Sequence, residues 1–165
     1  MGRGACAVEA RIAASWGALT AVAPIFQAAL DLPHGGVLCA LPALLAVGLL
    51  SSVEAFFSLP KGYYGLDGLF LLLAFLALAR VKTLESLRYC APGEWGKRLG
   101  WDRIPEVRTL RRKLHWLAEQ GQPEPWSAEL CRQWMASSPD RPGCFTSTAT
   151  SGSIMAGKPC CHAIT

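Results

Sequence analysis

The sequence contains no Cys-x-x-Cys pair, although seven cysteines are spread along its 165 residues. Its three histidines, His34, His115 and His162, also lie far apart. Zinc-binding motifs need closely spaced thiolate and imidazole ligands, so this spacing excludes the common ones. An odd number of scattered cysteines is typical of free thiols in a reducing cytoplasm. We therefore expect neither a disulfide framework nor a bound metal or other cofactor.

Charged residues are also scarce, at 17% of the chain, and 52% of the residues are hydrophobic. The amino terminus does not resemble a secretory signal, because Glu9 and Arg11 interrupt its apolar run and no clear cleavage site follows. The final 25 residues contain no Asp or Glu. The length is sufficient for one domain of ordinary size, and the carboxyl-terminal segment offers no carboxylate to a metal ion.

Composition and periodicity divide the chain into four regions and predict a mainly α fold. The first region is Ala-rich and ambiguous, and the second is an apolar helical core. The third is a basic, helix-turn-helix-like unit, and the fourth, rich in Thr, Ser, Gly and Cys, is a disordered tail. The predicted boundaries are residues 1–33, 34–82, 83–136 and 137–165.

The apolar second region allows an alternative interpretation, in which the chain spans a membrane. Residues 35–53 carry no charge, and Asp67 is the only charged residue between positions 63 and 79. Two transmembrane helices at about 35–53 and 63–80 would form a hairpin in the inner membrane, with the basic helices on the cytoplasmic side. Against it, a carboxylate inside hydrocarbon costs about 3 kcal/mol. The other interpretation is a cytoplasmic protein that buries both runs in a helical core.

Capping signals and periodicity predict four helices in the third region. Thr83 is positioned to cap the first, and Gly100 ends the second as a C-cap. Pro105 opens the third, because its missing N–H costs nothing at the first helical position. The predicted helices cover residues 83–89, 94–99, 105–117 and 126–135. We expect the core of this unit to include Trp95, Trp101 and Trp116.

Positive charge is concentrated in the third of these helices and just before it. Between positions 97 and 113 there are seven cations and two acids, a local balance of 7 − 2 = +5. Apolar residues recur there at intervals of 3, 3, 4 and 3, which places them on one buried stripe. The stripe consists of Ile104, Val107, Leu110, Leu114 and Leu117. The outer face then carries Arg108, Arg111, Arg112 and His115.

An amphipathic helix that buries leucines and exposes arginines suits binding to DNA phosphates, because each neutralised phosphate releases condensed counterions. Contact by four cations predicts a log–log salt slope of about −3.6. The predicted contacts to double-stranded DNA are Lys97, Arg98, Arg108, Arg111, Arg112 and Lys113. A solvated surface helix with no partner is the alternative.

Three stretches of the chain are distinctive: LPKGYYGL at residues 59–66, LRYCAPGEWGK at 87–97 and GWDRIPEVRTLR at 100–111. Together they resemble the amino-terminal region of a group of bacterial transposases of the DDE type. The resemblance covers roughly residues 34–141. It implies that these helices bind the terminal DNA of a mobile element. It also implies a following RNase-H-like domain, whose three carboxylates hold two Mg²⁺ or Mn²⁺ ions for strand cleavage and joining.

The tail does not supply that catalytic domain. When residues 144–165 are back-translated and read in the neighbouring frame, the codons permit Tyr-Val-Asp-Gly-His, similar to the family's first catalytic strand. Met155 has one codon, so its final G followed by the GC of Ala156 requires the Gly of the family pattern. We therefore predict a frameshift near residues 140–144. The predicted product is a truncated, DNA-binding transposase fragment without enzymatic activity. An alternative is that its first helices need the absent domain to cover their apolar surface and that the fragment is not stable alone.

Overall fold

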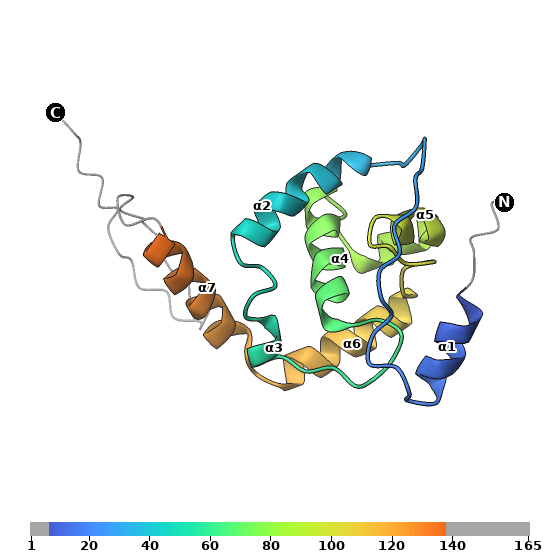
Figure 1. The fold of residues 1–165 in the computed structure, drawn as a ribbon. Coiled ribbons are helices and arrows are strands. Elements are labelled where there is room, and N and C mark those ends of the chain that lie inside the picture. The colour runs from blue at the N-terminus through green and yellow to red at the C-terminus, as the bar shows by residue number, and fades with distance from the viewer. Residues whose placement is uncertain (1–6, 138–165) are drawn as a thin grey trace.

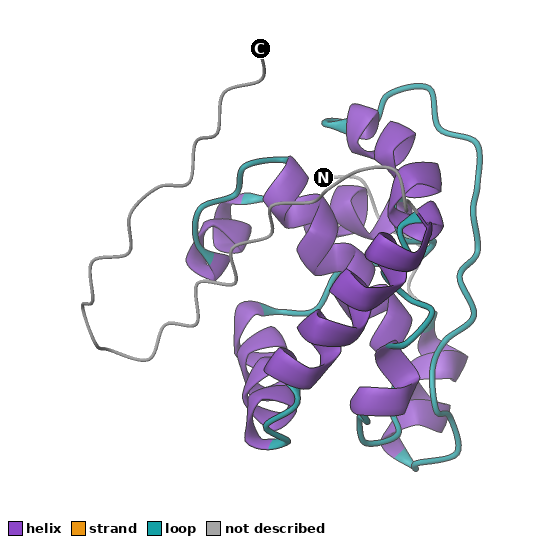
Figure 2. Ribbon diagram, turned by 90° about the vertical axis from the view of Figure 1, so that its left-hand side faces the viewer, coloured by secondary structure: helices purple, strands orange, loops and turns teal. Residues whose placement is uncertain are grey.

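The structure is a computed structural model that describes residues 7–137, and within them it contains helices and loops but no strand (Figures 1 and 2). The prediction of a mainly α fold is confirmed. The predicted disordered tail lies, apart from its first residue, outside the described residues. The α-helices are α1 Val8–Ser15, α2 Leu41–Ala46, α3 Val53–Phe56, α4 Leu66–Leu78, α5 Pro92–Lys97, α6 Val107–Glu119 and α7 Pro123–Ser137. The 3-10 helices are η1 Gly35–Ala40 and η2 Leu84–Tyr89.

The two apolar runs form several short elements instead of two long helices. The first run is divided among η1, α2 and α3, and Gly48 ends α2 at a positive φ of 77°. The second run forms α4, whose first turn exposes Asp67 to solvent. Within residues 7–137, no helix combines the length and the apolar character that a bilayer crossing requires. The described residues therefore do not favour the transmembrane hairpin considered above.

Helix α4 lies at the centre of the fold and supplies much of the hydrophobic core (Figure 1). Its side chains Leu69, Leu72 and Phe75 are at most 1% exposed. They belong to one cluster with side chains of α6 and of the loop before it. The apolar region and the basic region therefore share a single core.

Helix α7 closes one end of this core through aromatic contacts. The indole of Trp126 meets Phe57 edge-on, with ring centroids 5.7 Å apart, and meets Phe70 at 5.2 Å. Leu130, one turn further along α7, is buried. Edge-to-face aromatic pairs contribute stability beyond the area that they bury. The packing role predicted for this helix agrees with these contacts.

The basic helix begins two residues later than predicted. Ile104 donates its backbone N–H to the carbonyl oxygen of Pro92 at 3.0 Å, which ties the approaching chain to α5. The backbone of Glu106 is extended, with φ −61° and ψ 151°, so this residue is the N-cap and α6 begins at Val107. Pro105 is buried before the helix instead of forming its first turn.

Two other local predictions are corrected in detail. The segment after Thr83 is a 3-10 helix, and the Thr83 hydroxyl pairs with the Ser86 hydroxyl at 3.0 Å instead of capping the backbone. Helix α5 ends at Lys97, two residues earlier than expected. The turn at Gly100 is confirmed by its φ of 68°. A methyl group there would lie 2.8 Å from the backbone nitrogen of Ile25, so the position needs glycine for space as well.

The ambiguous first region forms α1 and an extended strap, residues 18–33, that crosses the folded core (Figure 1). Val22 donates its N–H to the carbonyl of Tyr63 at 3.0 Å, and Ile25 donates to the carbonyl of Gly100 at 2.8 Å. These bonds join the strap to two loops that are distant in sequence. The strap therefore covers part of the chain, including Arg98, that the sequence alone predicts to be exposed.

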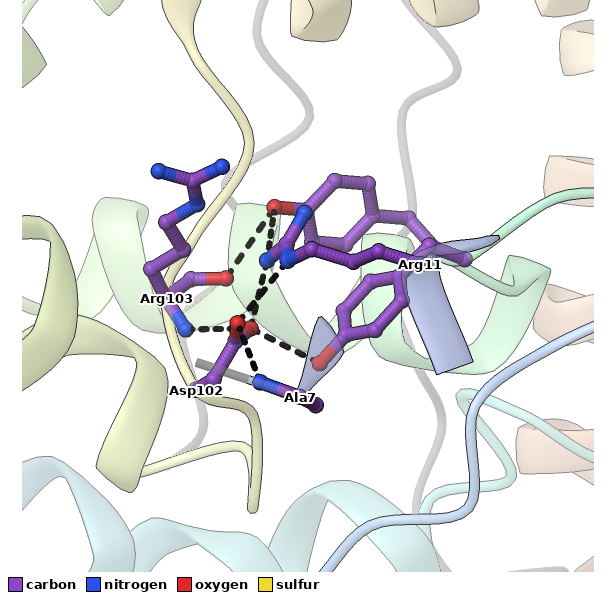
Figure 3. Close-up of polar contacts among 6 residues, drawn as sticks. Ala7, Arg11, Asp102 and Arg103 are labelled. Atoms are coloured by element: carbon purple, nitrogen blue, oxygen red, sulfur yellow. Dashed lines mark hydrogen bonds and ion pairs between the residues drawn. The ribbon is translucent and has the colours of Figure 1, made fainter. Parts of the chain in front are cut away.

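Helix α1 is fastened to the core by a polar cluster around Asp102 (Figure 3). The Asp102 carboxylate accepts hydrogen bonds from Arg11 Nε at 2.9 Å and Nη2 at 2.5 Å, from Tyr63 Oη at 2.7 Å and from Arg103 N at 2.7 Å. The Arg11 guanidinium also lies 4.1 Å above the Tyr63 ring. We name Arg11, Tyr63, Tyr64 and Asp102 the Asp102 cluster.

Burial and pairing have opposite effects on the pKa of Asp102. Burial raises the pKa of its carboxyl group, but hydrogen bonds from Arg11 and Tyr63 and the Arg11 charge outweigh it, so the pKa is lowered. Burial and the bond to Asp102 raise the pKa of Tyr63 to about 12. The cluster therefore holds a charged carboxylate and a neutral phenol at neutral pH.

Candidate nucleic-acid interface

The outer face of α6 presents two arginines to solvent. Arg108 and Arg112 are exposed and lie one turn apart. Among the residues that the structure describes, neither forms an ion pair. The predicted stripe is confirmed on the opposite face, where Val107, Leu110 and Leu117 are buried. Like charges four residues apart repel each other, so this arrangement favours an anion from outside the chain.

Arg111 is exposed on the same helix, but it already has a partner. Its guanidinium pairs with Glu85 of η2, which also lies 3.4 Å from Arg88. An exposed pair of this kind contributes little stability. It does reduce the net positive charge at this edge of α6. Arg111 is therefore a weaker candidate for phosphate contact than Arg108 or Arg112.

The expected surface position of Arg98 is corrected by the structure. This residue is 1% exposed, and its guanidinium stacks 3.9 Å from the Trp95 ring and donates to the carbonyl of Pro33 in the strap. Its Nε and Nη1 atoms have no hydrogen-bond partner among the described residues. Burial lowers the pKa of Arg98. The strap covers this side chain, so it does not reach a phosphate in this conformation.

The two predicted lysines lie in different surroundings. Lys97 is exposed in the last turn of α5. Lys113 is half-buried, and its Nζ donates to the carbonyl of Tyr64 at 3.1 Å. Burial, together with the neighbouring Arg112 charge, lowers the pKa of Lys113. The six cations predicted to contact DNA therefore lie in different surroundings: Arg98 is buried, Lys113 is half-buried, Arg111 is paired, and the other three are exposed.

Two hollows flank α6, one at its amino-terminal end and one along its middle. The first, which we name the α5 hollow, has a volume of about 360 Å³ and is bordered by the cations Arg88, Arg103 and Arg108. Glu106 also lines it, together with apolar groups such as Pro92. The hollow is therefore basic, but it contains one carboxylate.

The second hollow lies on the other side of α6 and has a volume of about 420 Å³. We name it the Trp116 hollow. Its cations are Lys61, Arg112 and Lys113, and its lining contains no Asp or Glu. Lys61 comes from the loop between α3 and α4, nearly fifty residues before α6. No local spacing in the sequence could have associated Lys61 with the basic helix.

The prediction that Trp116 fills the core is wrong. Its side chain is 48% exposed, whereas Trp95 and Trp101 are 4% and 6% exposed and confirm their predictions. The sequence did carry a signal, because Trp116 falls outside the 3, 3, 4, 3 spacing of the buried stripe. The residue type favours the core, whereas the position on the helix favours the surface, and here the position decides.

Two acidic residues near the interface have partners within the chain, and the third, Glu106, is exposed and makes no side-chain capping hydrogen bond. Glu85 pairs with arginines, Asp102 lies in its own cluster and Glu106 is the N-cap of α6. Within residues 7–137, no group of three or more His, Cys, Asp or Glu side chains is arranged to hold a metal ion. The described residues therefore do not fit the Mg²⁺ or Mn²⁺ pair that the resemblance implies, and we derive no metal-dependent step from them.

Fold and surface together define a small helical protein with an exposed cationic helix face. A family model described as "Transposase protein" matches residues 2–155, and the chain belongs to this transposase family. No curated protein and no solved structure matches the chain. The matched residues include much of the tail for which the sequence suggests a changed reading frame, and the frameshift stays a prediction.

Proposed function

We propose that this chain binds double-stranded DNA at the ends of a mobile element through the outer face of α6. One observation carries the proposal: Arg108 and Arg112 are adjacent, exposed and without ion pairs in the described part of the chain. Family membership supports a role in transposition, which acts on DNA. The cations of the two flanking hollows extend the positive surface on both sides of the helix.

The dimensions of α6 suit a groove of the duplex. Its 13 residues give a length of about 20 Å, and a major groove about 12 Å wide admits one helix. The short helix α5, the turn at Gly100 and the longer α6 follow the order of a helix-turn-helix unit. In this arrangement the exposed arginines meet phosphates, and such contacts position the protein without specifying sequence. A location with the bacterial DNA in the cytoplasm follows from the proposal.

Fluorescence anisotropy with a labelled duplex from the DNA that flanks the gene tests the proposal. Each phosphate contact contributes about 0.9 to the log–log salt slope, so the double variant Arg108→Gln/Arg112→Gln should reduce the slope by about 1.8. Arg132→Gln removes an exposed arginine of α7 that pairs with Glu129, and it is the control for the loss of a surface charge outside α6. Equal slopes for the double variant and the control, or no binding by the unchanged chain at low salt, contradict the proposal.

We also propose that this chain neither nicks nor joins DNA. The lack of acids after Asp140 and the structural roles of the acids near α6 support this. Incubation of the pure chain with supercoiled plasmid and Mg²⁺ or Mn²⁺ should leave the plasmid supercoiled, and metal-dependent nicking would contradict the proposal.

Sequencing the coding DNA tests the proposed frameshift, which requires codons for Tyr-Val-Asp-Gly-His in the neighbouring frame.

A further inference from the structure

The Trp116 hollow differs from the α5 hollow in the chemistry of its lining. Trp116 contributes a large aromatic surface that is 48% exposed, and Thr109 and Arg112 continue the wall along α6. The α5 hollow has neither an exposed tryptophan nor a fully cationic set of charges, because Glu106 lies among its arginines. The arginines of the α5 hollow can bind a phosphate, whereas the Trp116 hollow also offers an aromatic surface on which a planar, apolar group can stack.

The charges of the Trp116 hollow are arranged at two depths. Lys61 and Arg112 are exposed, whereas Lys113 is half-buried and donates to the Tyr64 carbonyl. Exposed cations next to an aromatic surface match the two parts of a nucleotide, since the base can stack and the phosphate can meet the cations. A volume of about 420 Å³ lies within the range of small-ligand sites.

A paired base cannot use this surface, because both of its faces are covered in the duplex. An unpaired base has a free π-face, and stacking on an aromatic side chain tolerates any of the four bases. We propose that the Trp116 hollow binds the first unpaired nucleotide at the end of a DNA duplex that lies along α6. Its base stacks on the Trp116 indole, and its phosphate lies between Lys61 and Arg112. The inference rests on the proposed function.

The test uses the full chain and one duplex in two forms, blunt or with a three-nucleotide overhang that begins with 2-aminopurine. Stacking quenches 2-aminopurine, so binding should lower its fluorescence, and the overhang should tighten binding about tenfold. Trp116→Ala should abolish both effects and leave blunt-end affinity unchanged, and Trp116→Phe should restore part of both. Met135→Ala, at an exposed apolar side chain of α7, is the matched control. Circular dichroism checks that each variant is folded.

The outcomes separate this inference from the proposed function. Equal affinity for both duplex forms, or quenching that persists in Trp116→Ala, overturns the inference while DNA binding stands. A single-stranded oligonucleotide that carries the same fluorophore is the second arm. If it binds in a Trp116-dependent way and no duplex binds, the proposed function fails and the assignment to a duplex end fails with it, although the hollow still binds an unpaired nucleotide. If neither DNA binds, both proposals fail. Equal quenching by the free 2-aminopurine nucleotide at the same concentration would also overturn the assignment to a duplex end.

Discussion

The Asp102 cluster and the outer face of α6 use arginine in opposite ways. Arg11 finds a carboxylate, a phenol and an aromatic face within the chain, so its charge is compensated internally. Arg108 and Arg112 find no carboxylate among the described residues and lie in solvent. The difference shows that the count of cations in a segment does not predict where charge is available. What matters is whether the fold brings a counter-charge to each cation.

The largest expected effect comes from removing the carboxylate of the cluster. Asp102→Ala leaves Arg11 beside the core without its partner, and breaking such a pair should lower the free energy of unfolding by about 3 kcal/mol. Asp31→Ala, at an exposed position of the strap, should change it by less than about 0.5 kcal/mol. Urea denaturation measures both. Similar losses for the two variants would remove the contrast between the regions.

The cluster should also make stability depend on pH at both extremes. The Asp102 pKa is lowered in the folded chain, so its contribution is present above the unfolded pKa and is lost as pH falls through the folded one. The Tyr63 pKa is raised from 10.0 to about 12, so its contribution is lost as pH rises across that interval, by no more than about 2 to 3 kcal/mol.

Thermal unfolding between pH 2 and 12 measures this dependence. Tyr63→Phe should flatten the alkaline side, and Asp102→Asn should flatten the acid side. The variant Arg108→Gln/Arg112→Gln should leave the profile unchanged, because arginine does not titrate in this range. If Tyr63→Phe loses stability at high pH as the unchanged chain does, groups other than Tyr63 cause that loss.

A smaller loss of stability is expected at Gly100, which lies against the strap that covers the buried Arg98. Gly100→Ala introduces a side chain at φ 68° and against the strap, and we expect a loss of about 2 kcal/mol. Gly121→Ala has a similar φ of 63° but open space around it, so it isolates the backbone strain. Gly100→Ala should also make Arg98 more reactive with phenylglyoxal, as detected by peptide mass spectrometry. Equal loss in both variants and unreactive Arg98 would contradict the covering role of the strap.

The smallest effect on stability belongs to the exposed arginines. Arg108→Gln/Arg112→Gln should change the free energy of unfolding by less than about 0.5 kcal/mol, because the pair makes no ion pair in the described structure and repels itself. The same variant is expected to weaken DNA binding strongly. Urea denaturation beside the anisotropy titration measures both quantities. A large loss of stability would mean that these residues support the fold rather than a partner.

Local pattern was sufficient to predict much of the basic helix. The spacing of Val107, Leu110 and Leu117 identified the buried face of α6, and Gly100 marked the turn before it. These features depend on residues within one or two turns of each other. The same spacing also located Arg108 and Arg112 on the exposed face. Secondary structure and the orientation of a helix face are therefore visible in sequence.

Contacts between distant segments were not predictable in this way. Arg98 is buried because the strap crosses it, and Lys61 reaches α6 because α3 and α4 bring its loop there. Neither relation has a periodic signature. Asp102 and Arg11 are separated by 91 positions, and nothing in either local segment indicates the other. The sequence predicted the helix but not the counter-charges and neighbours that decide what each cation does.

The Asp102 carboxylate connects the start of the chain to the edge of the cationic surface. It holds Arg11 of α1 on one side and the backbone nitrogen of Arg103, which borders the α5 hollow, on the other. A protease that trims the chain beyond position 11 would therefore release an anchor of the loop that carries Arg103. Such a nicked product should bind nucleic acid less tightly although every cation of α6 is still present.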